Sequence, residues 1–233
     1  MQHKAVAIVP SAGLGRRFGE GKNKPFETLG GKPVLIWALE ALERMPEISE
    51  IIPVLKETDI QAGTELFKHY KITKVKRIAP GGKERQDSVF NGLHFIKDNG
   101  SVVLIHDGAR PFLEPKTVRR ALRALSGCDG VVIGVPPKDT IKEIEGQLIR
   151  QTLKRDMLIA VQTPQIFFYQ PLLAAYEKAM KESFYATDDA ALVERNMGSI
   201  KVVKGEYTNI KITTPEDLVI AEAFLKMRGE EQQ

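Results

Sequence analysis

The chain has 233 residues, 42% hydrophobic and 27% charged, which suffices for one large α/β domain with a substantial core but not for two full domains. Its 34 basic and 30 acidic residues leave a net charge of +4 that is spread along the chain, so no basic arm for nucleic acid is indicated. Lone Cys128 excludes an intrachain disulfide, and we recognise neither a signal peptide nor an apolar run long enough to cross a membrane. We expect a single domain over residues 1–233, in the cytoplasm, without a nucleic-acid or membrane partner.

Apolar runs with strand character alternate with longer segments of helical period through the first 135 residues. The expected strands are 5–9, 51–55, 75–78, 102–105 and 131–135, and the expected helices are 34–44, 59–70, 84–96 and 116–126. This alternation predicts an α/β fold with a mostly parallel central sheet and helices on both faces. Ligands bind at the carboxyl ends of the strands in such sheets.

The pattern changes after residue 135. Residues 140–145 and 147–152 flank Gly146 as two extended runs, which predicts a protruding β-hairpin arm within 137–156 that packs on a second subunit. Helices at 171–181 and 188–196 and strands at 200–203 and 209–212 are expected next, and residues 162–165 read as a polar loop. The last helix has a clear start, in which Thr214 is the N-cap, Pro215 the first helical residue and Asp217 the capping carboxylate.

A loop of small and basic residues follows the first strand. Its small members are Ala12, Gly13 and Gly15, and its basic members are Arg16, Arg17 and Lys24. Small residues let backbone N–H groups approach an anion closely, and the cations supply opposing charge, so the loop is suited to a triphosphate. Phe18 stands where a dinucleotide fingerprint needs its third glycine, and the Walker ending is missing. An ordinary glycine-rich turn remains the alternative.

An aspartate follows the expected strand 102–105. Asp107 at this position could bind Mg²⁺, which takes one or two carboxylates and fills its other positions with water and phosphate oxygens. The alternative is that Asp107 caps the following turn, with Arg110 as its surface partner. His106 is better explained as a hydrogen-bonded histidine at the strand end than as a metal ligand.

Two further segments carry polar or charged side chains that could bind a ligand. Residues 80–88 place Gly81 and Gly82 before a helix with Ser88 one turn inside it, an arrangement that can read the polar edge of a base. Helix capping is the alternative there. Lys211 lies inside a short expected strand, where a buried ammonium needs an anion, unless it points to solvent from a sheet edge.

Taken together, these segments resemble the 2-C-methyl-D-erythritol 4-phosphate cytidylyltransferase family over almost the whole chain. The matching motifs are Ala12-Gly13-x-Gly15-x-Arg17, Asn23-Lys24, Gly81-Gly82-x-Glu84-Arg85-x-x-Ser88, His106-Asp107-x-Ala109-Arg110-Pro111, Asp139-Thr140, Thr163-Pro164-Gln165, Thr187-Asp188 and Asn209-x-Lys211-x-Thr213. The resemblance implies a Rossmann-like nucleotidyltransferase fold and a homodimer whose arms reach across to the partner. Two positions depart from the pattern: Pro25 after the lysine, and Thr208 where some members carry an acidic residue.

The resemblance implies transfer of a cytidylyl group from CTP to the phosphate of methylerythritol phosphate, a sugar-alcohol phosphate, with loss of pyrophosphate. The implied catalytic residues are Arg17, Lys24 and Lys211 around the α-phosphate, with Mg²⁺ or another divalent cation on Asp107. The implied nucleotide-binding residues are Ala12, Gly13, Gly15, Gly82, Asp87, Ser88 and Ala109. The implied acceptor site comprises Asp107, Arg110, Thr163 and Thr187 of one subunit, with Thr140 and Arg155 from the arm of the other.

Two other functions are compatible with these motifs. A ribitol 5-phosphate cytidylyltransferase of teichoic acid synthesis would share nearly every triphosphate-binding motif and differ only in the acceptor pocket. A nucleotide-sensing regulator without turnover would need a site emptied of charge, yet Arg17, Lys24, Asp107 and Lys211 are all present.

Overall fold

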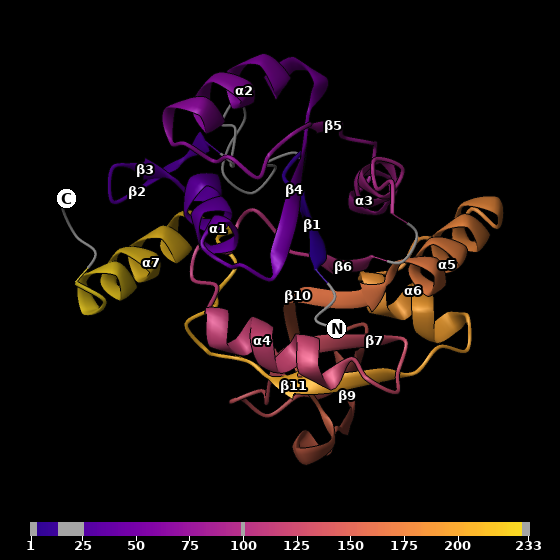
Figure 1. Ribbon diagram of the computed structural model, residues 1–233. Coiled ribbons are helices and arrows are strands. Elements are labelled where there is room, and N and C mark those ends of the chain that lie inside the picture. The colour runs from indigo at the N-terminus through magenta and orange to yellow at the C-terminus, as the bar shows by residue number, and fades with distance from the viewer. Residues whose placement is uncertain (1–3, 14–25, 99–100, 230–233) are drawn as a thin grey trace.

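A computed structural model describes residues 4–13, 26–98 and 101–229. Its core is a seven-stranded sheet with the order β11-β7-β10-β6-β1-β4-β5 (Figure 1). The strands are β1 (Ala5–Pro10), β4 (Ile48–Leu55), β5 (Ala79–Pro80), β6 (Val102–Ile105), β7 (Gly130–Val135), β10 (Ala160–Phe168) and β11 (Ile200–Lys204). Only β10 runs antiparallel to its neighbours in this sheet, so the prediction of a mostly parallel sheet is confirmed.

Helices cover both faces of the sheet, and β1 shows why. Alternate residues of β1 enter two different cores: Ala5, Ala7 and Val9 on one face, and Val6 with Ile8 on the other. The first face is covered by α1 (Val34–Glu43), α2 (Ile60–His69) and α4 (Pro115–Ala124), and the second by α3 (Arg85–Leu93), α5 (Tyr169–Lys181) and α6 (Asp189–Arg195). No helix of the described ranges is long and apolar enough to span a bilayer.

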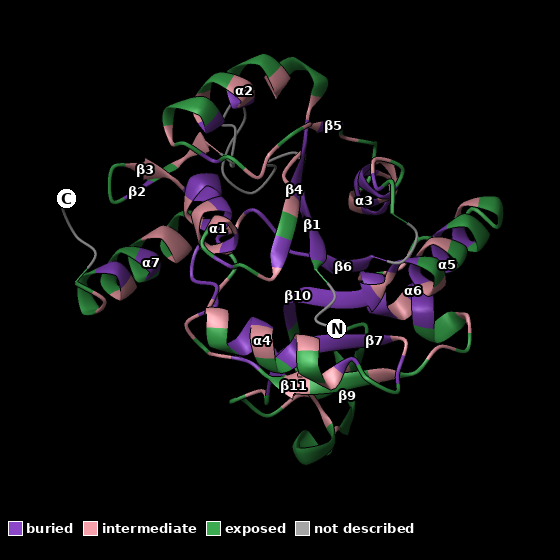
Figure 2. Cartoon of the chain, in the orientation of Figure 1, coloured by how far each residue is buried: buried purple, intermediate pink, exposed green. Residues whose placement is uncertain are grey.

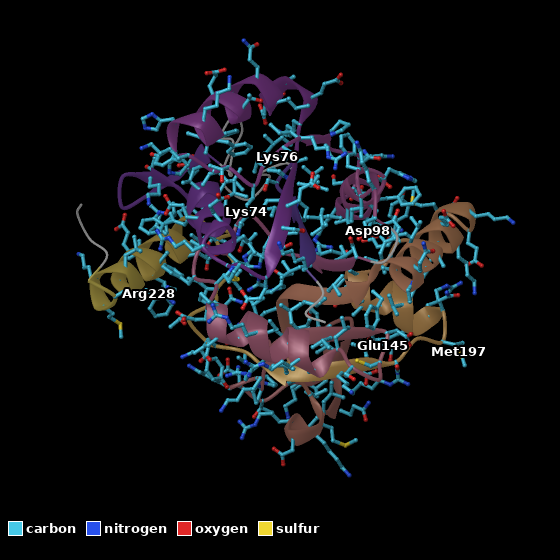
Figure 3. The ribbon with its side chains drawn as sticks, viewed as in Figure 1. Lys74, Lys76, Asp98, Glu145, Met197 and Arg228 are labelled. Atoms are coloured by element: carbon cyan, nitrogen blue, oxygen red, sulfur yellow. The ribbon has the colours of Figure 1, made fainter. Side chains whose placement is uncertain are left out.

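The last helix begins as the sequence predicts. α7 (Pro215–Met227) has a capping box in which Thr214 Oγ1 accepts from the Asp217 N–H and the Asp217 carboxylate accepts from the Thr214 N–H. Arg228, labelled beyond the end of α7 in Figure 3, pairs with Glu114 before α4. α7 also packs beside the small antiparallel pair β2 (Thr28–Leu29) and β3 (Lys32–Pro33).

The predicted polar loop at residues 162–165 is wrong, because these residues lie inside β10. Their polar side chains are buried but satisfied: Gln162 donates to the carbonyl of Glu206, and Gln165 donates to Asp188. The pairing of β10 with β7 shifts register between Gln162 and Gln165, which accommodates Pro164 without a ladder hydrogen bond.

Two expected strands are also wrong. In place of a strand at 75–78, Val75 forms one isolated bridge with Ile51, and the short β5 follows. Residues 209–212 form no strand: the Ile212 N–H donates to Ala109 in the loop after β6 and the Asn209 N–H donates to Glu206 in a local turn, so no ladder forms. Short apolar runs carry too little periodicity to distinguish a strand from an extended connection.

The protruding hairpin consists of β8 (Lys142–Glu145) and β9 (Leu148–Thr152), paired antiparallel around Gly146 at φ +59°. It lies within the arm expected at 137–156. Figure 1 shows it at the end of the molecule opposite α2, and Figure 2 shows β9 exposed along its length. The structure contains the β-hairpin, whereas its role as an arm that packs on a second subunit stays a prediction.

Candidate active site

Three loops meet where β1, β5 and β6 end. A Cβ added to Gly81 would lie 2.3 Å from the Cβ of Ala12, and one added to Gly108 would lie 2.2 Å from Ser11 Oγ. Any side chain at these two glycines would push the loops apart. The first loop, the 80–88 segment and the loop after β6 therefore form one edge of the sheet, as the parallel topology requires.

Hydrogen bonds within the 80–88 segment fix its conformation. Ser88 Oγ accepts from the Gly82 N–H at 3.0 Å and donates to the Glu84 carbonyl at 3.1 Å. Asp87 accepts from the Glu84 N–H at 2.9 Å, which completes a capping box at the start of α3. Capping thus accounts for the polar atoms of this segment, and base recognition by Gly82, Asp87 and Ser88 stays a prediction.

Three cations surround Asp107, directly after β6. Arg85 Nε lies 3.1 Å from Asp107 Oδ1, and Lys211 Nζ lies 2.8 Å from Asp107 Oδ2. Arg110 Nε is 3.7 Å from Oδ2, and its Nη1 donates to the Asn209 carbonyl at 2.7 Å. Lys211 pairs with an anion that the protein itself supplies, but it lies in no strand and 40% of its side chain is exposed, so the premise of a lysine buried in a strand is wrong.

This cluster has surplus positive charge. Asp107 is buried, and burial alone would raise its pKa, but Arg85, Lys211 and Arg110 lower that pKa far below its ordinary value, so the carboxylate stays ionised. Arg85 is shared with a second carboxylate, Asp189, so three cations face two anions among the groups that these contacts join. Lys211 keeps 40% of its side chain exposed and can face a ligand.

A chain of hydrogen bonds orients the Asp107 loop. Thr163 Oγ1 accepts from the Asp107 N–H at 3.0 Å and lies 3.2 Å from His106 Nδ1, while His106 Nε2 lies 3.0 Å from the Arg110 carbonyl. Burial lowers the pKa of His106 to about 4, so the ring is neutral near pH 7. A neutral ring that donates from Nε2 to the Arg110 carbonyl and accepts at Nδ1 from the Thr163 hydroxyl gives each of these groups a hydrogen-bond partner. The interpretation of His106 as a satisfied strand-end histidine is confirmed.

The segment after β11 lies against this loop and positions Lys211 beside it. The Ile212 N–H donates to the Ala109 carbonyl at 2.9 Å, and Asn209 Nδ2 donates to the Thr163 carbonyl at 2.9 Å. Asn209 is buried, its side-chain amide bonds to β10, and its backbone carbonyl accepts from Arg110 in the loop that follows β6. Ala109 therefore contributes a backbone carbonyl that aligns the Lys211 segment, and its predicted contact with a nucleotide stays a prediction.

Sequence reasoning missed Asp189 and gave Arg85 no role. Arg85 Nη1 and Nη2 donate to the two oxygens of Asp189 at 2.9 and 2.8 Å, and Tyr176 Oη donates to the same carboxylate. Burial alone would lower the pKa of Arg85, but Asp189 and Asp107 raise it well above its ordinary value. The sequence signal for Arg85 was its place in the motif Gly81-Gly82-x-Glu84-Arg85. Asp189 gave no such signal, because an acidic residue is common in the first turn of a helix.

The other predicted residues fall into three groups. Thr163 and Arg110 join Asp107, whereas Thr187 is exposed just before α6. Thr140 and Arg155 lie exposed in the arm, and Arg155 donates to the Lys138 carbonyl at 2.8 Å. The third group lies outside the described residues: Gly15, Arg16, Arg17 and Lys24. At Gly13, no described atom lies within 4 Å of an added Cβ.

Asp107 is the residue predicted to bind a metal ion, and the described residues form no larger cluster of metal ligands around it. Among the described residues, no group of three or more His, Cys, Asp or Glu side chains could hold a metal ion. Asp107 offers one carboxylate, and three cations already compete for its oxygens. The prediction that Asp107 binds Mg²⁺ stays a prediction, and the observed partners of this carboxylate are Arg85, Arg110 and Lys211.

Known proteins resemble the chain over nearly its full length. The sequence profile of the 2-C-methyl-D-erythritol 4-phosphate cytidylyltransferase family matches residues 5–227. A curated relative of that name from Geotalea uraniireducens is 44% identical over 232 residues, covering 98% of this chain and 100% of the relative. The crystal structure of 4-diphosphocytidyl-2C-methyl-D-erythritol synthase from Anaerococcus prevotii superposes with a TM-score of 0.85 at 34% identity, covering 97% of each chain. The Thermus thermophilus cytidylyltransferase gives 0.78 at 32% identity, covering 96% of this chain and 99% of the other.

Proposed function

The chain belongs to the 2-C-methyl-D-erythritol 4-phosphate cytidylyltransferase family, and we propose that its reaction takes place at the cation cluster around Asp107. The enzyme transfers a cytidylyl group from CTP to 2-C-methyl-D-erythritol 4-phosphate, giving 4-diphosphocytidyl-2-C-methyl-D-erythritol and pyrophosphate for isoprenoid precursor synthesis by the non-mevalonate pathway. Both the ribitol phosphate alternative and the regulator without turnover are set aside.

The surplus positive charge of the cluster is the observation that supports this location. An acceptor phosphate oxygen attacks the α-phosphorus of CTP in line, and negative charge builds on the five-coordinate phosphorus as pyrophosphate leaves. Preorganised cations stabilise that charge without reorganising during the step. Lys211 suits this role because Asp107 fixes one side of its ammonium while the rest of the side chain is partly exposed. Arg17 and Lys24 stay predicted as its catalytic partners.

We assign the divalent cation to the substrate. Mg²⁺ would enter as the magnesium complex of CTP, because phosphate oxygens and water supply most of the six ligands that it prefers. Asp107 would then serve to hold Lys211, Arg110 and Arg85 at fixed positions. Asp107 would then contribute to the reaction by aligning these cations and not by coordinating the metal ion.

The nucleotide and acceptor assignments follow the family motifs. Ala12, Gly13, Gly15, Gly82, Asp87, Ser88 and Ala109 are proposed to bind CTP. Asp107, Arg110, Thr163 and Thr187 are proposed to bind the acceptor. Support comes from the close approach of Ala12 to Gly81 and from the hydrogen bond between Asp107 and Thr163, which join members of each set at this edge of the sheet. Thr140 and Arg155 would complete the acceptor site of a second subunit in a homodimer, in the cytoplasm where CTP is available.

Asp107→Asn separates the two roles of Asp107. With pyrophosphate release as the assay, we expect kcat to fall on the order of 10²-fold because the cations lose their common anion. The Mg²⁺ concentration that gives half-maximal activity should stay as in the unaltered enzyme. A requirement raised about tenfold would instead make Asp107 a metal ligand.

The same assay tests the acceptor. Offered methylerythritol 4-phosphate and ribitol 5-phosphate in parallel, the enzyme should release pyrophosphate with the first. Turnover of ribitol phosphate alone would contradict the assignment.

A further inference from the structure

Residues 184–189, here called the acceptor segment because they include Thr187, are fastened to the first turn of α3. Gln86 is buried; its Nε2 donates to the Phe184 carbonyl at 2.9 Å, and its Oε1 accepts from the Ala186 N–H at 2.9 Å. The first turn of α3 belongs to the 80–88 segment that is proposed to bind the base. Two loops that face different substrates are therefore joined directly by hydrogen bonds.

Arg85 adds an ionic connection, because its three guanidinium nitrogens bind two carboxylates. Its two terminal nitrogens grip Asp189, the last residue of the acceptor segment, while its Nε donates to Asp107 at 3.1 Å. Asp189 is 0% exposed, and Tyr176 also donates to it, so its position is fixed by the α5 helix. A guanidinium fork can span two carboxylates in one plane, which a lysine cannot do.

We propose that Arg85 is a positioning residue that aligns Thr187 and the Asp107 cluster with the bound nucleotide. This inference rests on the proposed function, since it takes Thr187 and Asp107 as acceptor-binding groups. Residue 187 lies between Ala186, which is bonded to α3, and Asp189, which Arg85 holds. Displacing Asp189 would therefore move the acceptor segment while leaving the glycine turn of the 80–88 segment in place.

The chain contains a matched arginine pair that serves as a control. Arg77 grips Glu50 with two hydrogen bonds, at 2.8 and 3.2 Å, and its side chain is 28% exposed against 31% for Arg85. No contact of the described residues connects Arg77 to Asp107. If Arg85 only stabilised the fold, loss of either arginine would have similar kinetic consequences.

Steady-state kinetics of R85Q and R77Q test the proposal. For R85Q we expect kcat/KM for the acceptor to fall on the order of 10²-fold, with the KM for CTP changed less than about twofold. R77Q should keep both parameters. R85K should stay impaired because an ammonium cannot hold both carboxylates. An equal rise in KM for both substrates in R85Q, or full activity in R85K, would overturn the inference.

Hydrogen exchange gives a readout that does not depend on catalysis. Peptides covering 184–189 should exchange faster in R85Q and stay unchanged in R77Q. The double variant R85Q/D189N removes both charges, so it avoids an unpaired buried carboxylate if R85Q folds poorly, and it should show the same exchange and acceptor defect. Protection equal to that of the unaltered enzyme would refute the role of Arg85.

Thr187→Ala separates this inference from the function on which it rests. We expect the KM for the acceptor to rise about tenfold in T187A with normal exchange at 184–189. An acceptor KM equal to that of the unaltered enzyme would remove Thr187 from the proposed acceptor site, whatever R85Q does.

Discussion

The cluster around Asp107 and the hairpin arm each carry part of the predicted acceptor site, and they differ in how firmly the chain itself holds them. Asp107, His106 and Thr163 are buried and bonded to one another. Thr140 and Arg155 of the arm are exposed, and Arg155 donates a hydrogen bond to the backbone carbonyl of Lys138. Figure 2 shows the same contrast, with a buried β6 and an exposed β9.

The contrast indicates what each region lacks. The cluster is held together by its own ion pairs and hydrogen bonds, whereas the arm has exposed apolar side chains that no part of the described chain covers. Leu148 is 77% exposed, and Ile144, Ile149 and Met157 are also largely exposed. An isolated two-stranded hairpin is marginally stable in water, so a covering surface from a second copy would order it.

The largest effect should follow from removing the exposed cation of the cluster. In Lys211→Met we expect kcat to drop about 10²-fold or more, because the charge on the reacting phosphorus loses a preorganised partner. Thermal unfolding should change little, since Arg85 and Arg110 still neutralise Asp107. Lys68→Met, in an exposed pair on α2, is the control. A Lys211→Met enzyme within a few-fold of normal activity would exclude Lys211 from catalysis.

Acid should lower the stability of the folded chain through protonation of His106. The pKa of His106 is about 4 in the folded chain against 6.5 ordinarily, so between these values the unfolded chain binds a proton that the native chain does not. The free energy of unfolding should fall by about 3 kcal/mol as the pH drops through this window. Urea unfolding across the window measures the loss.

The matching variants show whether His106 is responsible. His106→Asn should flatten this part of the pH dependence, and His69→Asn, an exposed histidine of α2, should leave it intact. A slope that persists in His106→Asn would assign the effect to other groups.

A smaller effect is expected in the arm. Arg155→Ala should raise the KM for the acceptor about tenfold, the value of one charge-assisted hydrogen bond, with little change for CTP. Arg150→Ala removes another arginine of the same arm, paired with Glu143 at 3.1 Å, and should have no kinetic effect. Equal weakening of CTP and acceptor in Arg155→Ala would refute the role of the arm.

The smallest change concerns the apolar surface of the arm. Leu148→Ser should alter the stability of the isolated fold by less than about 0.5 kcal/mol, as for other exposed sites. With the arm as the proposed dimer interface, the substitution should weaken dimerisation roughly fivefold, for about 1 kcal/mol of lost burial. Sedimentation at several concentrations measures this, with the exposed Val219→Ser of α7 as the control. Identical dimerisation in both variants would move the interface elsewhere.

Local patterns in the sequence determined most of the architecture. The alternation of apolar strands with helical segments predicted the sheet and its two helical layers, because each element must bury one face or stripe regardless of its partners. The hairpin around Gly146 and the capping box of Thr214 with Asp217 follow from contacts within a few residues. Asp107 was identified for the same reason, since a polar residue directly after a buried strand lies at the ligand edge of a parallel sheet.

The tertiary structure alone decided which charges meet. Arg85 and Asp189 are 104 positions apart, and Lys211 reaches Asp107 from residues 209–212, which were predicted as a strand but form none. β10 was hidden because its polar residues, Gln162 and Gln165, resemble a loop until their buried partners are known. Periodicity reports how one element faces the core, whereas the pairing of distant ionic groups depends on how the whole chain closes, so only the folded chain specifies it.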